Sequence, residues 1–239
     1  MQYILGDLHA NIRELERLLR QLSPASDDTF IFLGDYIDKL PHTAETLALL
    51  HALRREHTCV FVKGNHEFVW ERYVLSQEKE RGDFLREFGG REALQGFGRD
   101  VQNALLQNDF SVLQHALVSY FDLMTMMVDW HRTGEYLALH AGLLPEQYDQ
   151  PSPRFLEKNF FVRPQDIPRE RKYLNRYTLV AGHTHLGTEP TVEEGYINID
   201  LGAGYGKFLG ALCVEEQIVV RSDGEKFPIP KPEKAQKVL

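Results

Sequence analysis

Five short segments of this 239-residue chain place metal-ligating side chains directly after apolar, strand-like runs. They are ILGDLH (4–9), FLGDYID (32–38), FVKGNHE (61–67), LALHAG (137–142) and LVAGHTH (179–185). Each contains a glycine, which lets the chain bend sharply and bring the neighbouring side chain toward a shared centre. The polar types are Asp, Asn and His with no thiolate, which suits manganese, iron or zinc in a hydrolytic site rather than a structural zinc site.

Seven of these side chains are the candidate metal ligands: Asp7, His9, Asp35, Asn65, His140, His183 and His185. Two divalent ions about 3.5–4 Å apart can bind both the attacking and the departing oxygen of a displacement at phosphorus. A carboxylate that bridges both ions is the natural link. Asp35 is the best candidate, because it follows the second strand at the position nearest the expected centre. The pattern therefore predicts a two-metal phosphoesterase.

Taken singly, each segment has an ordinary structural interpretation. Asp7 with His9 is typical of a helix cap beside a surface histidine, and Asn65-His66 is typical of a turn. His140 alone would be a hydrogen-bonded core histidine. The five segments together favour a site, because ligand sites of open α/β sheets form where several strands end.

The elements that must position these residues alternate between strand and helix in the first third of the chain. Strand patterns at 3–5, 29–33 and 58–62 alternate with helical patterns at 12–22 and 43–55, which indicates a βαβαβ order. In the first helix, leucines recur at three- and four-residue spacing, so one face should pack on a sheet. Asn11 is the expected N-cap.

The rest of the chain is expected to form a helical insertion and then a second run of strands. The insertion covers about 68–118, followed by a hairpin of 120–130 and 136–140 around a turn at 131–134. Residues 145–170 are expected to form a surface loop. Further strands are expected at 178–181, 196–199, 209–214 and 218–221. We predict one domain over 1–226 and a C-terminal tail over 227–239.

Composition and charge narrow the function. The chain is 43% hydrophobic and 26% charged, as expected of a globular protein. Its net charge of −8 argues against a stable nucleic-acid partner, since that affinity comes from Lys and Arg on phosphates. No signal peptide and no stretch of about eighteen apolar residues is visible, so we expect a cytoplasmic protein without a membrane partner. Cys59 and Cys213 are expected to be reduced core thiols.

The run GDLH, GDYID, GNHE, LHAG and GHTH resembles the calcineurin-like metallophosphoesterases. It is closest to their phosphoprotein-phosphatase branch, which includes bacterial Ser/Thr phosphatases and symmetrical diadenosine tetraphosphate hydrolases. FLREFGGREALQGFG (84–98) and INIDLGAGYGKFLGALCVEE (197–216) are similar to a helical segment and a closing hairpin of bacterial members. The resemblance covers most of the chain and implies an α/β fold, a four-layer αββα sandwich of mixed sheets flanked by helices.

The resemblance also implies a division of the ligands between two metals. One would be held by Asp7, His9, Asp35 and His185, and the other by Asp35, Asn65, His140 and His183. Manganese is the first choice, with iron and zinc as alternatives. The resemblance implies a hydroxide between the metals as nucleophile, without a phosphoenzyme. His66 would be the general acid, oriented by Asp38.

Four further residues are candidates for binding substrate. Lys39 follows GDYID where family members carry a phosphate-clamping Arg, and a lysine lacks the planar bidentate fork. Lys63, before GNHE, also stands where Arg is common. Arg163 in FFVRP resembles an arginine of bacterial members. Tyr205 in GAGYG either lines the pocket or is an ordinary aromatic at a strand end.

The leading function is hydrolysis of phosphate monoesters on Ser, Thr or Tyr of a phosphoprotein, or on a small phosphorylated molecule. The alternative is symmetrical cleavage of dinucleoside tetraphosphates, which needs aromatic rings to stack bases. Phe155, Phe160 and Phe161 could serve, or they could anchor their loop to the core. A catalytically silent scaffold would lack a ligand, and none is missing. A nuclease is disfavoured by the acidic charge.

Overall fold

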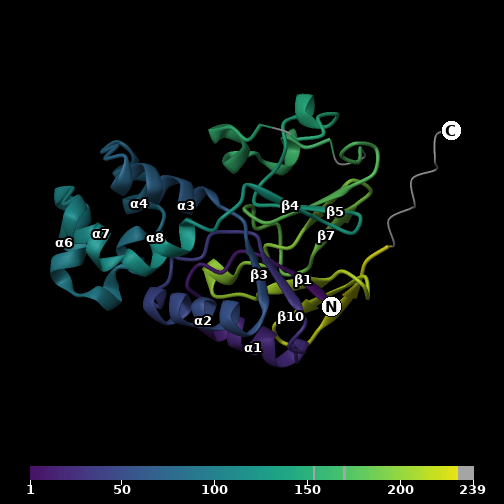
Figure 1. The fold of residues 1–239 in the computed structure, drawn as a ribbon, viewed down its shortest axis with the longest axis horizontal. Helices are drawn as coiled ribbons and strands as arrows, with labels where there is room; N and C mark the ends of the chain where they lie inside the picture. The colour runs from purple at the N-terminus through teal and green to yellow at the C-terminus, as the bar shows by residue number, and fades with distance from the viewer. Residues whose placement is uncertain (153, 169–170, 231–239) are drawn as a thin grey trace.

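Two mixed β-sheets pack face to face with helices around them (Figure 1) in the computed structural model, which describes residues 1–152, 154–168 and 171–230. The first sheet has the order β11 (Lys226–Pro228), β10 (Ile218–Arg221), β9 (Gly210–Cys213), β1 (Gln2–Leu5), β2 (Thr29–Phe32) and β3 (Thr58–Phe61). The second has the order β4 (Trp130–Thr133), β5 (Tyr136–Leu139), β6 (Thr178–Ala181), β8 (Tyr196–Asn198) and β7 (Thr191–Glu193). The predicted α/β class with mixed sheets is confirmed.

The parallel strands β1, β2 and β3 are joined by two helices, α1 (Ile12–Leu22) and α2 (Thr43–Glu56). Asn11 caps α1, since its side-chain oxygen accepts a hydrogen bond from the Glu14 backbone N–H at 3.3 Å. Leu15 and Leu18 are fully buried in a cluster that also holds residues of β1 and β2. The predicted βαβαβ order is therefore confirmed.

The apolar side chains of the strands point alternately into two layers. On the inner face, Ile4 and Ile31 of the first sheet share a cluster with Val180 and Ile197 of the second. The outer face of the second sheet is covered by the described residues of 143–174, that is, without 153, 169 and 170, and parts of this segment form short 3-10 helices. These are η3 (Pro145–Gln147), η4 (Glu157–Phe161) and η5 (Pro164–Asp166). The fourth layer of the sandwich is thus built from an irregular segment.

The helical insertion leaves the end of β3 and forms a separate lobe beside the sheets (Figure 1). It contains α3 (Asn65–Trp70), a π-helical turn (Glu71–Leu75), α4 (Arg81–Glu87), α5 (Gly90–Ala93), a 3-10 turn (Gln95–Phe97), α6 (Arg99–Gln107), α7 (Phe110–Ala116) and α8 (Val118–Met124). The strand expected at 120–130 is therefore wrong over its first half, which is α8. Tyr120, Phe121 and Leu123 are buried on this helix, and a short apolar run does not distinguish helix from strand. The turn of the hairpin also lies later, since 131–133 belong to β4.

The C-terminal segment begins within the first sheet, because β11 pairs antiparallel with β10. Residues 231–239 of the expected tail lie outside the described residues. Both cysteines are free thiols, Cys213 buried and Cys59 half-buried. No helix in the described part of the chain is long and apolar enough to cross a membrane.

Candidate metal centre

The predicted ligands follow strands of both sheets and meet at one place. Asp7, Asp35 and Asn65 come after β1, β2 and β3, while His140 and His183 come after β5 and β6. The two sheets are tied together there, since the His140 Nδ1 lies 2.9 Å from the Leu33 carbonyl oxygen. All five of these side chains are buried or nearly so. The strand ends thus create a buried polar centre between the sheets.

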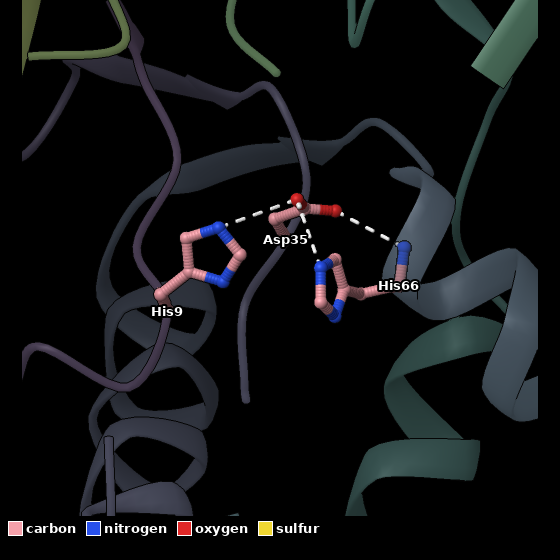
Figure 2. A group of neighbouring side chains, drawn as sticks. All are labelled: His9, Asp35 and His66. Carbon is pink, nitrogen blue, oxygen red and sulfur yellow. Dashed lines mark hydrogen bonds and ion pairs between the residues drawn. The ribbon is translucent and has the colours of Figure 1, made fainter. Parts of the chain in front are cut away.

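Asp35 lies at the middle of this centre. Its carboxylate belongs to two groups whose ligand atoms all lie within 4.8 Å of one another, one with His9 and His66 and one with His140 and His183. Figure 2 shows the first group, with His9 and His66 approaching Asp35 from opposite sides. One carboxylate shared by two ligand groups is the arrangement expected of a bridging ligand.

The contacts of His140 indicate a place for a cation. Its Nδ1 faces only a carbonyl oxygen, so Nδ1 carries the ring proton, and Nε2 of the neutral imidazole is an acceptor. That Nε2 lies 2.8 Å from the Asn65 Oδ1 and 3.4 Å from an Asp35 oxygen. Three acceptors facing one another repel unless a positive ion lies among them. His183 adds its Nδ1 at 3.0 Å from the same Asn65 oxygen.

Asp7 and His9 approach Asp35 from the β1 side. His9 donates its Nδ1 proton to the Ile37 carbonyl at 3.1 Å, which leaves Nε2 directed at Asp35 at 3.4 Å. The carboxylate of Asp7 accepts the His183 backbone N–H at 2.9 Å. Gly182 is required here, because a Cβ at that position would lie 1.9 Å from an Asp7 oxygen. The structure therefore brings both residues to the centre.

The described contacts of His185 are with Asp200 and Tyr205. Its Nδ1 lies 3.4 Å from the Asp200 carbonyl oxygen, and its ring lies 5.5 Å from the ring of Tyr205. It does not belong to either group around Asp35 among the described residues. Its assignment as a ligand stays a prediction.

The backbone at this centre is strained. Five non-glycine residues have a positive φ: His9 (46°), Asp35 (51°), Asp38 (75°), Lys39 (63°) and His183 (67°). Such conformations cost about 1–3 kcal/mol each and concentrate at functional sites. They persist because hydrogen bonds over-determine them, such as the backbone N–H groups of Leu8 and His9 that both reach the Asp35 carbonyl.

His66 is held differently from the other histidines. Its Nδ1 donates to Asp38 at 2.6 Å, and the Trp70 indole N–H also donates to Asp38 at 3.0 Å. Its Nε2 lies 3.8 Å from an Asp35 oxygen, so this nitrogen faces the centre. The pairing predicted between His66 and Asp38 is thus present, and the Trp70 indole N–H, 3.0 Å from both Asp38 oxygens, helps to fix the carboxylate.

Electrostatics separate His66 from the ligand histidines. Burial lowers the pKa of His9, His140 and His183, so these rings stay neutral and keep a lone pair for a metal. Burial acts on His66 in the same direction, but the charge of Asp35 and the hydrogen bond to Asp38 raise its pKa overall. A ring whose pKa is raised, beside rings whose pKa is lowered, is the one best suited to donate a proton.

Two of the four candidate substrate-binding residues, Lys39 and Tyr205, lie beside the centre. The Lys39 Nζ lies 2.8 Å from the His9 Nε2 and 4.5 Å from the centroid of the Tyr205 ring, which is 61% exposed. Arg163 is exposed, and its charge contributes to the lowered pKa of His183. Lys63 instead forms an ion pair with Glu71 at 2.9 Å.

The three candidate base-stacking phenylalanines have different positions. Phe160 is buried and stacks on Phe68 at 5.0 Å, and Phe155 packs against Phe160 at 5.3 Å. Phe161 is half-buried and lies 6.4 Å from the ring of His183. Phe155 and Phe160 therefore anchor their segment to the core, which is one of the two interpretations that the sequence allowed. Phe161 faces the centre.

The sequence matches the pattern of the calcineurin-like phosphoesterases over residues 3–215. This chain belongs to that family. A Ser/Thr-protein phosphatase of Arabidopsis thaliana is 43% identical over 72 residues, which is 27% of this chain and 7% of the relative. The chain thus spans a small fraction of that curated relative.

Solved phosphatases share the fold at low identity. A cold-active protein-tyrosine phosphatase of a Shewanella species superposes with a TM-score of 0.64 at 14% identity, covering 98% of this chain and 80% of that one. A putative diadenosine tetraphosphatase gives 0.54 at 18% identity, covering 92% and 91%. A protein Ser/Thr phosphatase of Saccharomyces cerevisiae gives 0.54 at 12%, covering 95% and 79%.

The donor set of this calcineurin-like phosphoesterase fits divalent metals. Its ligand atoms are carboxylate and amide oxygens and neutral imidazole nitrogens, which manganese, iron and zinc all accept. Gly64 leaves space beside Asp35, because a Cβ there would lie 2.3 Å from the Asp35 Oδ1. The Nδ1 of His183 lies beside the Asn65 oxygen, so this nitrogen is the one that faces the centre.

Glu67 is a functional candidate that sequence reasoning missed. Its carboxylate accepts the backbone N–H of Asp35 at 2.7 Å, of Gly64 at 3.0 Å and of Tyr36 at 3.0 Å, and it also accepts the Tyr120 hydroxyl. Burial and the charge of Asp35 raise the pKa of Glu67 to about 7. It therefore fixes the loop that carries Asp35. A Glu three residues after Gly64 is a capping signal that could have revealed it.

Proposed function

We propose that this chain is a two-metal phosphomonoesterase acting on phosphorylated Ser, Thr or Tyr side chains, or on small phosphate esters. The observation that carries the proposal is the meeting of His9 on one side and of His140 and His183 on the other at the single carboxylate of Asp35, with the His66–Asp38 pair beside it. Metal ligands and a proton donor at one point are what hydrolysis of a phosphate ester needs.

We assign the ligands to two cations, with manganese as first choice. Asp7, His9, Asp35 and His185 would hold one, and Asp35, Asn65, His140 and His183 the other. When bound, the cations supply Lewis acidity at the phosphoryl oxygens and lower the pKa of water. Because none of the donors is a thiolate, iron and zinc compete with manganese according to supply.

The proton donor in this proposal is His66. Asp38 holds the Nδ1 proton at 2.6 Å, so the Nε2 proton is the one directed at the centre. In the reaction that proton moves to the departing ester oxygen, which leaves as an alcohol or phenol. Asp38, itself tied to Trp70, keeps the ring in the orientation that allows this transfer.

Lys39 and Arg163 are the cations proposed to hold the non-bridging phosphate oxygens. The Lys39 ammonium already lies against His9 and the face of Tyr205, so its position is limited by both. Lys63 would have to break its ion pair with Glu71 to take part. Its role as a substrate ligand is the weakest of the four.

Cleavage of dinucleoside tetraphosphates is the second candidate, because Phe161 faces His183 and offers one ring for stacking a base. The packing of Phe155 and Phe160 into the core removes the other two rings that sequence reasoning offered for this purpose. We therefore favour monoesters.

A cytoplasmic location agrees with two free thiols.

The test is steady-state hydrolysis by manganese-loaded protein of a phosphothreonine peptide and of diadenosine tetraphosphate, each with a chelator control. Chelator-sensitive release of phosphate from the peptide, with slower turnover of the dinucleotide, is expected. Faster release of ADP from the dinucleotide would favour the second candidate. Activity that survives removal of metal would contradict both.

A further inference from the structure

Three phenylalanines form an aromatic cluster beside the proton donor. Phe84 is on α4, and Phe88 follows the end of α4. Phe161 is the last residue of the 3-10 helix η4, which belongs to the segment that covers the second sheet. The Phe84 ring centroid lies 4.7 Å from that of Phe88 and 6.1 Å from that of Phe161. We name these three residues the aromatic wall. The wall joins the insertion to the segment 143–174.

The wall contacts the centre through two histidines. Phe84 lies 5.2 Å from the His66 ring in an edge-to-face arrangement, and Phe161 lies 6.4 Å from the His183 ring. His66 is the residue that would protonate the departing oxygen, so the group attached to that oxygen must lie on the His66 side. The wall therefore borders the space of the leaving group.

The wall is only partly covered by the protein. Phe84 and Phe161 are half-buried, and Phe88 is 43% exposed. Phe84 and Phe161 pack on the core with one side and leave the other partly uncovered. Apolar rings left partly uncovered beside a charged centre offer a surface for a ligand. Aromatic rings favour other aromatic rings in stacked or edge-to-face contact.

We propose that the aromatic wall binds the ring of an aryl phosphate, in practice the phenyl ring of phosphotyrosine. This inference rests on the proposed phosphomonoesterase function and names its substrate class. The ring of phosphotyrosine is bonded directly to the departing oxygen, so protonation by His66 brings that ring against Phe84. A phosphoserine or phosphothreonine leaving group offers no ring at this distance. A nucleobase is separated from the cleaved phosphate by a ribose and further phosphate.

The experiment compares two peptides of identical flanking sequence, one with phosphotyrosine and one with phosphothreonine, and adds diadenosine tetraphosphate. Wild-type protein loaded with manganese should prefer the tyrosine peptide in kcat/KM. Phe88→Ala should lower kcat/KM about 10-fold on that peptide, equivalent to about 1.4 kcal/mol, and less than twofold on the threonine peptide. Phe88 is exposed, so its truncation should leave the fold intact.

Leu106→Ala is the matched control, since Leu106 is an exposed apolar residue of α6 in the same lobe, 48% exposed. It should leave kcat/KM unchanged on both peptides. If Phe88→Ala lowers kcat/KM equally on both peptides, or on neither, the proposal that the aromatic wall binds the ring is overturned. The proposed phosphomonoesterase function is not affected by that result. A loss confined to diadenosine tetraphosphate would assign the wall to a base instead. If wild-type protein hydrolyses neither peptide, the proposed function fails and this inference fails with it.

A binding measurement checks the same point without turnover. Manganese-loaded protein should bind phenylphosphonate more tightly than methylphosphonate in calorimetry, and Phe84→Leu should remove most of that difference. Equal affinity for the two phosphonates in the wild-type protein would contradict the wall. Because the two phosphonates share one charged head group, the comparison isolates the ring.

Discussion

The inner and outer parts of the candidate site are built in opposite ways. The inner part, around Asp35, is buried, and several of its candidate ligands are held by the backbone, as His140 is by Leu33 and His9 by Ile37. The outer part, represented by Phe88 and Tyr205, is exposed and contacts mainly other side chains. The difference indicates that the inner part determines the chemistry and the outer part the substrate.

The strongest test of this division is Asp35→Asn. The change removes the charge of the carboxylate shared by both ligand groups but keeps its size. A loss of several kcal/mol of transition-state stabilisation, or about 10³-fold in kcat/KM, is expected on every phosphate ester. Steady-state kinetics on the phosphothreonine peptide and p-nitrophenyl phosphate measure it, and circular dichroism should show an unchanged fold.

Asp27→Asn is the control, because Asp27 is an exposed aspartate on the loop before β2. It should be as active as the wild-type protein. Metal content should also fall in Asp35→Asn, as measured by elemental analysis after dialysis. Full activity and full metal content in that variant would remove Asp35 from the bridging position.

The second test separates the proton donor from the metal ligands. His66→Asn should slow the phosphothreonine peptide about 10²–10³-fold, because its alcohol leaves only when protonated. It should slow p-nitrophenyl phosphate less than about tenfold, since that phenolate hardly needs a proton. Asp38→Asn should follow the same pattern with smaller losses, because it acts through the orientation of His66. Equal losses on both esters would exclude His66 as the donor.

The third test concerns the support of the inner part. Glu67→Gln keeps the shape of the side chain but turns one acceptor oxygen into a donor facing backbone N–H groups. The loop that carries Asp35 should shift, and metal affinity should fall about 10–100-fold, as for other partners of metal ligands. Calorimetric titration with manganese measures it. Tyr120→Phe removes a single hydrogen bond to Glu67, so it should lower the affinity for manganese less than Glu67→Gln does. An equal loss in both variants would mean that the lobe, rather than the Asp35 loop, is disturbed.

The inner part was predictable from sequence for a physical reason. A glycine beside Asp, Asn or His at the end of an apolar strand is a local pattern. Five such patterns sufficed to predict Asp35, His140 and His183 as candidate metal ligands. The βαβαβ order was equally predictable, because the spacing of apolar residues along the chain distinguishes a helix from a strand. Both parts of the prediction needed no knowledge of contacts between distant segments.

What sequence could not supply were contacts between distant elements. The wall joins Phe84 to Phe161, 77 positions apart, and no local pattern indicates that pairing. The same holds for Tyr120, read as a strand residue, whose hydroxyl reaches Glu67 from α8. The contact of His185 with the ring of Tyr205 is likewise a contact between distant segments, and its assignment as a ligand stays a prediction.

The smallest expected effect belongs to the outer part. Lys39→Ala should raise KM for the phosphothreonine peptide about fivefold, the value of about 1 kcal/mol for a partly exposed ion pair, with kcat changed less than twofold. Lys39→Arg should restore or improve KM, because its planar fork binds phosphate through two hydrogen bonds. Lys207→Ala is the control, since Lys207 is an exposed lysine two residues beyond Tyr205. A loss in kcat as large as that in KM would place Lys39, through its contact with the His9 Nε2, among the inner residues.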